Sequence, residues 1–397
     1  MVQQATETEC LRLSLESWGP LGDALAHHDG MEVRVFGGIP GEEVMAEVVK
    51  RRRDYTAARV VKVLTPSPHR TVAPCSYFGA CTGCQWQHVE YGHQLEIKAQ
   101  MVEAALRDVG GFDSPPVLPT IGSPEEYGYR NHARPTVGRR YGDLGFVNRE
   151  SRRFVPITQC LLMHPRINQS LGQLVGVCKE TSQMSIRLGV NTDDFLIQPA
   201  MKSPDVLLPS GQKHYREALE GREFRIAASS FFQVNTPQAE RLVGLVREGL
   251  QLSGDDVVVD AYAGVGVFAI LLAPHAREVI AIEESASAVD DARFNAAGME
   301  GVRFLQGKTE EMLAQLEEMP QGVILDPPRA GCQMAALEAL MRLGPRRVVY
   351  VSCDPETLAR DLSILCRGVF QLERVQPVDM FPQTHHVECV ATLSSRA

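Results

Sequence analysis

Two side chains near the end of the chain have types and surroundings that suit covalent catalysis. Cys353 follows an apolar stretch, residues 348–351, and precedes Pro355, a common first residue of a helix. Backbone N–H groups at a helix N-terminus favour the thiolate form of such a cysteine. Glu388 stands in an otherwise apolar run, residues 387–393, where burial would raise its pKa toward that of a base active near neutrality. The alternative for Cys353 is a buried thiol that only packs.

A glycine-containing turn predicts a cofactor site. Asp260 begins the stretch Asp260-Ala-Tyr-Ala-Gly264-Val-Gly266, which follows an apolar strand and precedes a helical stretch. Glycines there let the backbone approach a ligand at the carboxyl edge of an α/β sheet. The third glycine of a dinucleotide motif is missing because Phe268 and an alanine follow. Glu283 ends the next strand, where it could accept both ribose hydroxyls, so the pattern favours S-adenosylmethionine over NAD. The alternative is a plain tight turn.

A third motif, Asp326-Pro-Pro-Arg329, directly follows the apolar residues 323–325. Each proline fixes φ, so the loop would be rigid beside the cofactor. Methyltransferases that act on exocyclic amines commonly carry an aromatic residue after the two prolines, and this chain has Arg329. The motif therefore counts against amine methylation. Its alternative is a turn that only ends the strand.

Four cysteines have spacing that suits a metal centre. Cys75, Cys81 and Cys84 lie close together in the chain, and Cys160 lies far downstream. Three thiolates with a distant fourth can enclose one metal site and join two segments. Zinc and an iron–sulfur cluster remain open from the spacing alone, and unrelated free thiols are the alternative.

The elements that would position these side chains change in type along the chain. Residues 10–64 alternate apolar and polar positions between Gly and Pro turns, which predicts a small β-barrel. A linker at 65–68, a helix over 91–108 and a Pro-rich break at 114–119 follow. Arg-rich sequence of mixed β character then extends to about residue 228.

The C-terminal part has the pattern of an α/β domain. Thr236 and Pro237 make a good helix start. Short apolar strands then alternate with helical stretches, which predicts a mostly parallel, Rossmann-like sheet covered on both faces. We therefore expect three domains: a β-barrel over 1–68, a central α+β domain over 69–228, and a cofactor-binding domain over 229–397.

Charge is unevenly distributed along the 397 residues. The formal net charge is −9, and all of the excess lies after residue 228, where 23 acidic residues face 14 basic ones. Basic residues cluster within 50–62, and eight arginines lie within 130–166. A net acidic chain argues against a simple nucleic-acid binder. Local basic patches in the neutral N-terminal part still permit one.

The N-terminal residues lack a signal-peptide pattern, and the longest nearly apolar run, residues 265–274, is too short to cross a bilayer. Ten cysteines without an export signal indicate reduced thiols, metal ligands or catalysts. We expect a cytoplasmic protein without membrane association, and a monomer.

Taken together and in order, these motifs resemble one family along essentially the whole chain. The chain is similar to the RNA uracil-C5-methyltransferases, and most to the iron–sulfur 23S rRNA (uracil-5-)-methyltransferases with an N-terminal TRAM domain. Besides the motifs already given, the resemblance covers Tyr129-Arg-Asn131, Phe232-Gln-Val-Asn235 and the tail from Asp379 to Glu388.

The resemblance implies roles for individual residues. Cys353 resembles the family nucleophile and Glu388 its base. Cys75, Cys81, Cys84 and Cys160 resemble ligands of a [4Fe–4S] cluster. The positions that resemble the S-adenosylmethionine contacts are Gln233, Tyr262, Gly264, Glu283 and Asp326.

Three departures from the family pattern concern the cofactor and the nucleophile. Val267 stands where some members have a polar residue, no Asp or Asn near Lys308 is available for the adenine, and Asp354 replaces an Asn often found after the nucleophile. The catalytic residues themselves match.

The implied substrate is RNA, with 23S rRNA favoured and tRNA as the alternative because some cluster-bearing members act on tRNA. A non-catalytic RNA-binding iron–sulfur protein is the alternative from another class. Base flipping requires a grip on the RNA, which the basic patches would provide, with Tyr129 as a stacking partner. The residues expected to contact RNA are Lys50, Arg51, Arg52, Arg53, Tyr129, Arg130 and Arg134.

Overall fold

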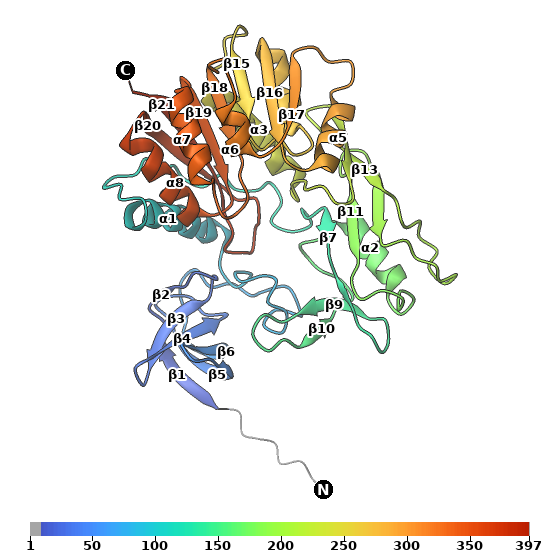
Figure 1. Ribbon diagram of the computed structural model, residues 1–397. Coiled ribbons are helices and arrows are strands. Elements are labelled where there is room, and N and C mark those ends of the chain that lie inside the picture. The colour runs from blue at the N-terminus through green and yellow to red at the C-terminus, as the bar shows by residue number, and fades with distance from the viewer. Residues whose placement is uncertain (1–8, 397) are drawn as a thin grey trace.

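The computed structural model describes residues 9–396 and contains an N-terminal β-sheet, a central region of small sheets, and a C-terminal α/β lobe (Figure 1). The N-terminal sheet and the central sheets lie on one side of the C-terminal lobe in this view. Within residues 9–396, no helix is both long and apolar enough to cross a membrane.

The N-terminal sheet has six strands in the order β1-β5-β6-β4-β3-β2. Alternate side chains point inward and form one apolar cluster, which confirms the short alternating strands predicted from the sequence. The hydrogen-bonded ladder ends at β1 and β2, so closure into a TRAM-type barrel stays a prediction. The strands are β1 (Cys10–Ser14), β2 (Ser17–Trp18), β3 (Ala24–His28), β4 (Met31–Phe36), β5 (Glu43–Arg51) and β6 (Thr56–Thr65).

The central region begins with helix α1, Tyr91–Asp108, whose bounds match the predicted helix. Two small three-stranded sheets follow, and a two-stranded hairpin leads into the C-terminal lobe. Their elements are β7 (His132–Ala133), β8 (Thr136–Val137), β9 (Leu144–Val147), β10 (Phe154–Pro156), α2 (Pro165–Leu174), β11 (Ser185–Leu188), β12 (Phe195–Gln198), β13 (His214–Leu219) and β14 (Arg222–Ala227).

The C-terminal lobe contains a seven-stranded sheet in the order β17-β16-β15-β18-β19-β21-β20. The first five of these are parallel, and β21 is antiparallel to both of its neighbours. The predicted mostly parallel, Rossmann-like sheet is confirmed. Its strands are β15 (Val257–Asp260), β16 (Glu278–Glu283), β17 (Val302–Gln306), β18 (Gly322–Leu325), β19 (Arg347–Ser352), β20 (Phe370–Val378) and β21 (Glu388–Ser395).

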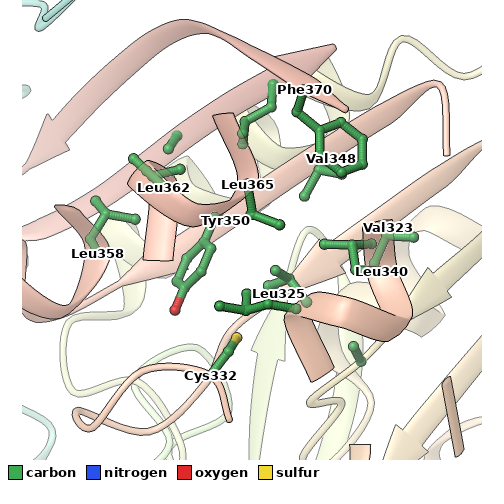
Figure 2. Close-up of a cluster of buried hydrophobic side chains, with 14 of the residues drawn as sticks. Val323, Leu325, Cys332, Leu340, Val348, Tyr350, Leu358, Leu362, Leu365 and Phe370 are labelled. Atoms are coloured by element: carbon green, nitrogen blue, oxygen red, sulfur yellow. The ribbon is translucent and has the colours of Figure 1, made fainter. Parts of the chain in front are cut away.

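Helices cover both faces of this sheet, as its continuously apolar strands require. Helices α6, α7 and α8 share one apolar cluster, and α3 and α4 share the other. Figure 2 shows the first cluster, in which Tyr350 of β19 lies among the leucines of α8 and near Cys332. The helices are α3 (Thr236–Leu250), α4 (Val267–Leu272), α5 (Ala286–Asn295), α6 (Thr309–Ala314), α7 (Met334–Leu343) and α8 (Pro355–Arg367), with a short 3-10 turn at Ala273–His275.

Helix α1 packs on the C-terminal sheet although it lies far earlier in the chain (Figure 1). Its Val102 and Leu106 are fully buried in the same cluster as α7 and α8. Beyond the helix, the backbone N–H groups of Leu118 and Ile121 donate to carbonyls of β20. The segment 91–121 therefore extends the C-terminal lobe and lies beside the loop that joins β20 to β21.

Candidate active site at the carboxyl edge of the C-terminal sheet

Cys353 and Glu388 lie at the same edge of the sheet on neighbouring strands. The antiparallel register pairs Ser352 of β19 with Cys389 of β21. That pair is the last of the ladder, and Cys353 and Glu388 are the next residues beyond it on the two strands; they lie close enough for the Glu388 charge to act on the Cys353 thiol. Cys353 is partly exposed, whereas Glu388 is buried. The structure thus brings together the two residues that the sequence singled out separately.

Their pKa values are shifted in the same direction. Burial raises the pKa of Glu388 well above its usual range, and Asp326 adds to the rise. Burial and the Glu388 carboxylate raise the pKa of the Cys353 thiol to about 11. The expectation that the helix N-terminus would favour a thiolate is wrong for the free protein, because burial outweighs it. Asp354, which caps that helix by accepting the N–H of Thr357 at 3.1 Å, adds a further negative charge.

Arg329 is a cation beside this pair. Its positive charge lowers the pKa of both Cys353 and Glu388 against the larger effect of burial. The guanidinium lies 3.3 Å from Nδ1 of His386, and the Arg329 carbonyl accepts the Thr357 hydroxyl at 3.1 Å. The loop after Asp326 therefore places a positive charge beside Cys353 and Glu388.

A buried cluster behind this loop escaped the sequence reasoning. Asp361 of α8 accepts the Tyr350 hydroxyl at 2.6 Å and the backbone N–H of Cys332 at 2.8 Å. It therefore joins strand β19, helix α8 and the end of the Arg329 loop, and Figure 2 shows Tyr350 and Cys332 side by side. The sequence signal that could have revealed this cluster is Asp361, an acidic residue within the otherwise apolar face of α8.

The predicted cofactor turn is held by hydrogen bonds to the carboxylates of Glu283 and Asp260. Glu283 accepts the N–H of Gly264 at 2.9 Å and that of Ser285 at 2.7 Å. Asp260 accepts the N–H of Ala269 in α4 at 3.1 Å. Gly264 has φ +54°, and open space lies where a Cβ would project. Asp260, Gly264 and Glu283 thus meet at the ends of β15 and β16.

Gln233 and Tyr262, the other predicted cofactor contacts, are partly exposed. The Gln233 carbonyl accepts the side-chain N–H of Asn131 at 3.1 Å, which joins two of the motifs named above. Burial, with a contact to Cys332, raises the pKa of Tyr262 and keeps its hydroxyl protonated. Asp326 lies at the end of β18, at the same edge.

These residues fit a ligand of the S-adenosylmethionine type. Asp260 Oδ1 is buried without a hydrogen-bond partner among the described residues. Burial and the nearby Asp326 raise the pKa of Asp260 to about 7. An unpaired buried acceptor, an open glycine backbone and an acid that ends β16 are complementary to a cation bearing hydroxyl and amino groups.

The four predicted metal ligands gather in one region. Burial raises the pKa of Cys81, Cys84 and Cys160, and the other thiols of the set add to each rise. The Tyr77 hydroxyl lies 3.0 Å from Oγ1 of Thr158 and thereby joins the two cysteine segments. Across residues 9–396, however, no three His, Cys, Asp or Glu side chains converge closely enough to hold a metal ion. Thiolate sulfur is a suitable metal ligand, and the [4Fe–4S] cluster stays a prediction.

The predicted RNA-contacting cations are accessible. Lys50, Arg51, Arg52 and Arg53 are exposed at the turn between β5 and β6. Two of them are paired on the surface, Arg51 with Glu9 at 2.6 Å and Arg52 with Glu150 at 3.4 Å. Arg134 is exposed, and Arg130 is partly exposed.

Tyr129 differs from its predicted role. The residue is only 5% exposed, and its hydroxyl donates to the Pro382 carbonyl at 3.1 Å. Pro382 belongs to the loop between β20 and β21. This placement does not support base stacking, and it makes Tyr129 a contact of that loop.

A hollow of about 770 Å³ lies between β6 and the cysteine segment. Two aromatic rings, Phe36 and Phe78, line it together with Arg59 and Arg70. Both arginines are paired with glutamates, Arg59 at 2.9 Å and Arg70 at 2.5 Å. No residue lining this hollow belongs to the edge that carries Cys353.

Comparison with known proteins gives relatives of nearly full length. Residues 212–396 match the family described as tRNA (Uracil-5-)-methyltransferase. An RNA methyltransferase of Gloeobacter violaceus, named as uncharacterized, is 37% identical, covering 94% of this chain and 93% of the relative. A second RNA methyltransferase, from Halalkalibacterium halodurans and also named as uncharacterized, is 32% identical, covering 98% of each chain.

Among solved structures, the chain is similar to the Pyrococcus abyssi tRNA (uracil-54, C5)-methyltransferase in complex with S-adenosyl-L-homocysteine. The TM-score is 0.76 at 25% sequence identity, and the match covers 96% of this chain and 100% of the other. The likeness therefore extends beyond the C-terminal lobe to the N-terminal and central regions.

Proposed function

Because this chain belongs to the RNA methyltransferase family and carries the tRNA (uracil-5-)-methyltransferase domain, we propose that it methylates C5 of a uridine in RNA. The observation that carries the proposal is that Cys353 and Glu388 both lie just beyond the last pair of the β19–β21 ladder, where the charge of Arg329 acts on both. A nucleophile and a base at one point are what C5 methylation of uracil requires.

The first step activates a carbon that is a poor nucleophile. The Cys353 thiolate adds to C6 of the uracil, and the electron pair of the C5–C6 double bond moves to C5 and the adjacent carbonyl as an enolate. The charge of Arg329 favours the thiolate and offsets the negative charge on the adduct. Bound S-adenosylmethionine would supply the methyl group that C5 takes up.

Glu388 then completes the reaction. Its carboxylate removes the proton from C5, the C5–C6 double bond forms again, and the bond between C6 and the Cys353 sulfur breaks. The raised pKa of Glu388 makes it a stronger base than an exposed glutamate. The thiolate is regenerated, and the proton remains on Glu388 until solvent removes it.

The methyl donor would be held at the ends of β15, β16 and β18. Glu283 would accept the ribose hydroxyls, and the open backbone at Gly264 would let the ligand approach closely. The remaining residues proposed as contacts are Gln233, Tyr262 and Asp326. The S-adenosyl-L-homocysteine bound by the Pyrococcus abyssi neighbour supports this assignment.

The target uridine would have to leave its stack, so the enzyme must grip RNA around the site. The exposed cations Lys50 to Arg53, with Arg130 and Arg134, are suited to phosphate contacts. The N-terminal sheet would act as a TRAM-type RNA-binding domain. The acidic excess lies in the C-terminal part of the chain, so we place the RNA grip mainly in residues 1–228.

The four cysteines Cys75, Cys81, Cys84 and Cys160 would hold a [4Fe–4S] cluster with a structural role. The effect of neighbouring thiols of the set on the pKa values of Cys81, Cys84 and Cys160 supports this assignment, because it shows that the thiols lie near one another. A cluster there would fix the segment 75–84 to the segment around Cys160. No catalytic step requires it.

For the substrate we favour 23S rRNA, because the cysteine set and the N-terminal sheet occur together as in the rRNA enzymes that the sequence resembles. A second candidate is tRNA. The likeness to the Pyrococcus abyssi tRNA enzyme over the whole of that chain favours it.

The two substrates can be separated directly. Purified protein, S-adenosylmethionine and either 23S rRNA or tRNA transcripts are incubated, and 5-methyluridine is mapped by mass spectrometry. We expect methylation at one or two uridines of 23S rRNA and none with the Cys353→Ala variant. Methylation of tRNA alone would assign the second substrate. No transfer to either RNA would favour a non-catalytic RNA-binding protein.

A further inference from the structure

The loop that leads to Glu388 is fastened by residues far away in the chain. We name residues 379–387, between β20 and β21, the base loop. It has contacts with α1, with the segment after Cys84 and with the start of α3. From these contacts we propose that helix α1 positions the catalytic base, with Lys98 and Gln94 as positioning residues. The proposal rests on the proposed function, in which Glu388 is that base.

Lys98 makes the first of the contacts that hold the base loop. Its ammonium donates to Asp379 Oδ1 at 2.5 Å and to the Phe381 carbonyl at 3.2 Å, and neither charged side chain is exposed to solvent. Asp379 Oδ1 also accepts the N–H of Phe381 at 3.1 Å. A buried ion pair of this kind costs desolvation and contributes geometry more reliably than stability. One lysine therefore fixes the first turn of the base loop.

Gln94 lies one helical turn earlier on the same face of α1. It makes the second of the contacts that hold the base loop. Its side-chain amide donates to Oε1 of Gln383 at 3.0 Å and accepts the backbone N–H of Gln383 at 3.0 Å. Gln383 has φ +68°, a left-handed conformation that is unfavourable for a residue other than glycine. The reciprocal hydrogen bonds hold the loop in this conformation.

The segment after Cys84 reinforces the same point of the loop. The N–H groups of Gln85 and Trp86 both donate to the Gln383 carbonyl at 3.1 Å. His385 lies 3.3 Å from Oε1 of Gln85 through its Nδ1. Gly22, in the turn between β2 and β3, lies so close that a Cβ there would be 2.7 Å from the Cβ of His385. Glu388 follows His385 by three residues and is the first residue of β21, so the loop leads directly into the proposed base.

The test distinguishes an effect on the position of Glu388 from a loss of stability of the whole protein. Lys98→Met leaves the Asp379 carboxylate buried without its cation and can unfold the protein, so the deciding variant is the double substitution Lys98→Met with Asp379→Met. An apolar pair of similar size often preserves stability in place of a buried ion pair. Gln94→Ala is the companion variant. Gln100→Ala, at an exposed position of the same helix, is the matched control.

The readout is the covalent RNA–protein adduct, detected on denaturing gels during single turnover on the RNA that the wild type methylates. A displaced Glu388 removes the C5 proton slowly, so the adduct should accumulate in the double variant and in Gln94→Ala. We expect kcat to fall about 10²-fold with KM for RNA within about twofold of wild type. The Gln100→Ala control should behave as wild type.

Two outcomes would overturn the proposal. If the double variant is folded and turns over at the wild-type rate, α1 does not position Glu388. If kcat falls without adduct accumulation, the ion pair serves only the fold. Failure of the proposed function is distinguishable, because the wild type itself would then methylate no uridine, or Glu388→Gln would trap no adduct.

Discussion

Cys353 and Glu388 each lie one residue beyond the Ser352–Cys389 pair that ends the β19–β21 ladder. The proposed nucleophile therefore lies at the end of one strand and the proposed base at the start of its antiparallel neighbour. This relationship depends on β21 running against the parallel strands, because a parallel β21 would begin at the opposite edge of the sheet.

Replacing the base should trap the reaction at the adduct. In Glu388→Gln, Cys353 can still add to C6, but removal of the C5 proton should slow by about 10²–10⁴-fold. A methylated RNA–protein adduct should therefore persist on denaturing gels and in mass spectra. Cys353→Ala is the control that can form no adduct. Full turnover by Glu388→Gln would assign the base to another residue.

The thiol of the free protein should react slowly at neutral pH. Burial and Glu388 raise the pKa of Cys353 to about 11, so the thiolate fraction should grow about tenfold per pH unit between pH 7 and 10. Iodoacetamide labelling of the Cys353 peptide, followed by mass spectrometry, should show this slope. Arg329→Gln removes the cation that lowers the pKa and should slow labelling at pH 8, whereas Arg329→Lys should preserve it. A rate independent of pH above 7 would contradict the raised pKa.

Asp260 should make stability depend on pH. Its pKa is raised to about 7 in the folded protein, above the unfolded value, so its contribution is present at low pH and lost as pH rises through 7. Asp260→Asn cannot ionise. Its free energy of unfolding relative to wild type should therefore increase between pH 5 and 8, by on the order of 2 kcal/mol.

Urea denaturation at the two pH values measures this difference. Asp255→Asn, an exposed neighbour, is the matched control and should show little change with pH. An equal difference at pH 5 and pH 8 for Asp260→Asn would mean that its folded-state pKa is not raised.

Removing cations at the β5–β6 turn should weaken RNA binding without affecting the methyl donor. Lys50→Ala with Arg53→Ala should reduce the slope of log K against log salt by about two. The comparison is Arg342→Ala with Arg367→Ala, two exposed arginines near the C-terminal ends of α7 and α8. Equal losses in the two double variants would place the RNA grip elsewhere.

Loss of one thiol should release a bound metal. Cys84→Ser is expected to lower the iron content of protein purified without oxygen and to abolish visible absorption of a [4Fe–4S] cluster. Cys178→Ser, a buried thiol outside the set, should retain both. Zinc in the wild-type protein in place of iron would correct the identity of the metal.

The sequence predicted most elements because their signals are local. Helix α1 has the predicted bounds, and the apolar strands β15, β16, β18 and β19 lie where their residues indicated. The antiparallel insertion of β21 was not predicted, because the direction of a strand depends on the connection before it. Distant partners also decide whether a residue is covered, so the burial of Tyr129 and its contact with the base loop were missed.

In the candidate site, too, local sequence signals were predicted and effects of distant residues were missed. Spacing within the motifs identified Cys353, Glu388 and Asp326, since each follows or begins an apolar strand. The sign of the Cys353 pKa shift was wrong, because it depends first on burial and then on Glu388, which lies 35 positions later in the chain. The contacts by which Gln94 and Lys98 hold the base loop were not predicted either, because a lysine on a helix is usually solvated.

The position of β21 also has a consequence for protein synthesis. This strand is made after the other six strands of its sheet, yet it inserts between β19 and β20. A nascent chain on the ribosome therefore contains Cys353 and the glycine turn after Asp260 before Glu388 has been made. Until β21 is translated, the sheet lacks the strand that joins β19 to β20, so Glu388 is the last of the proposed catalytic groups to reach its place.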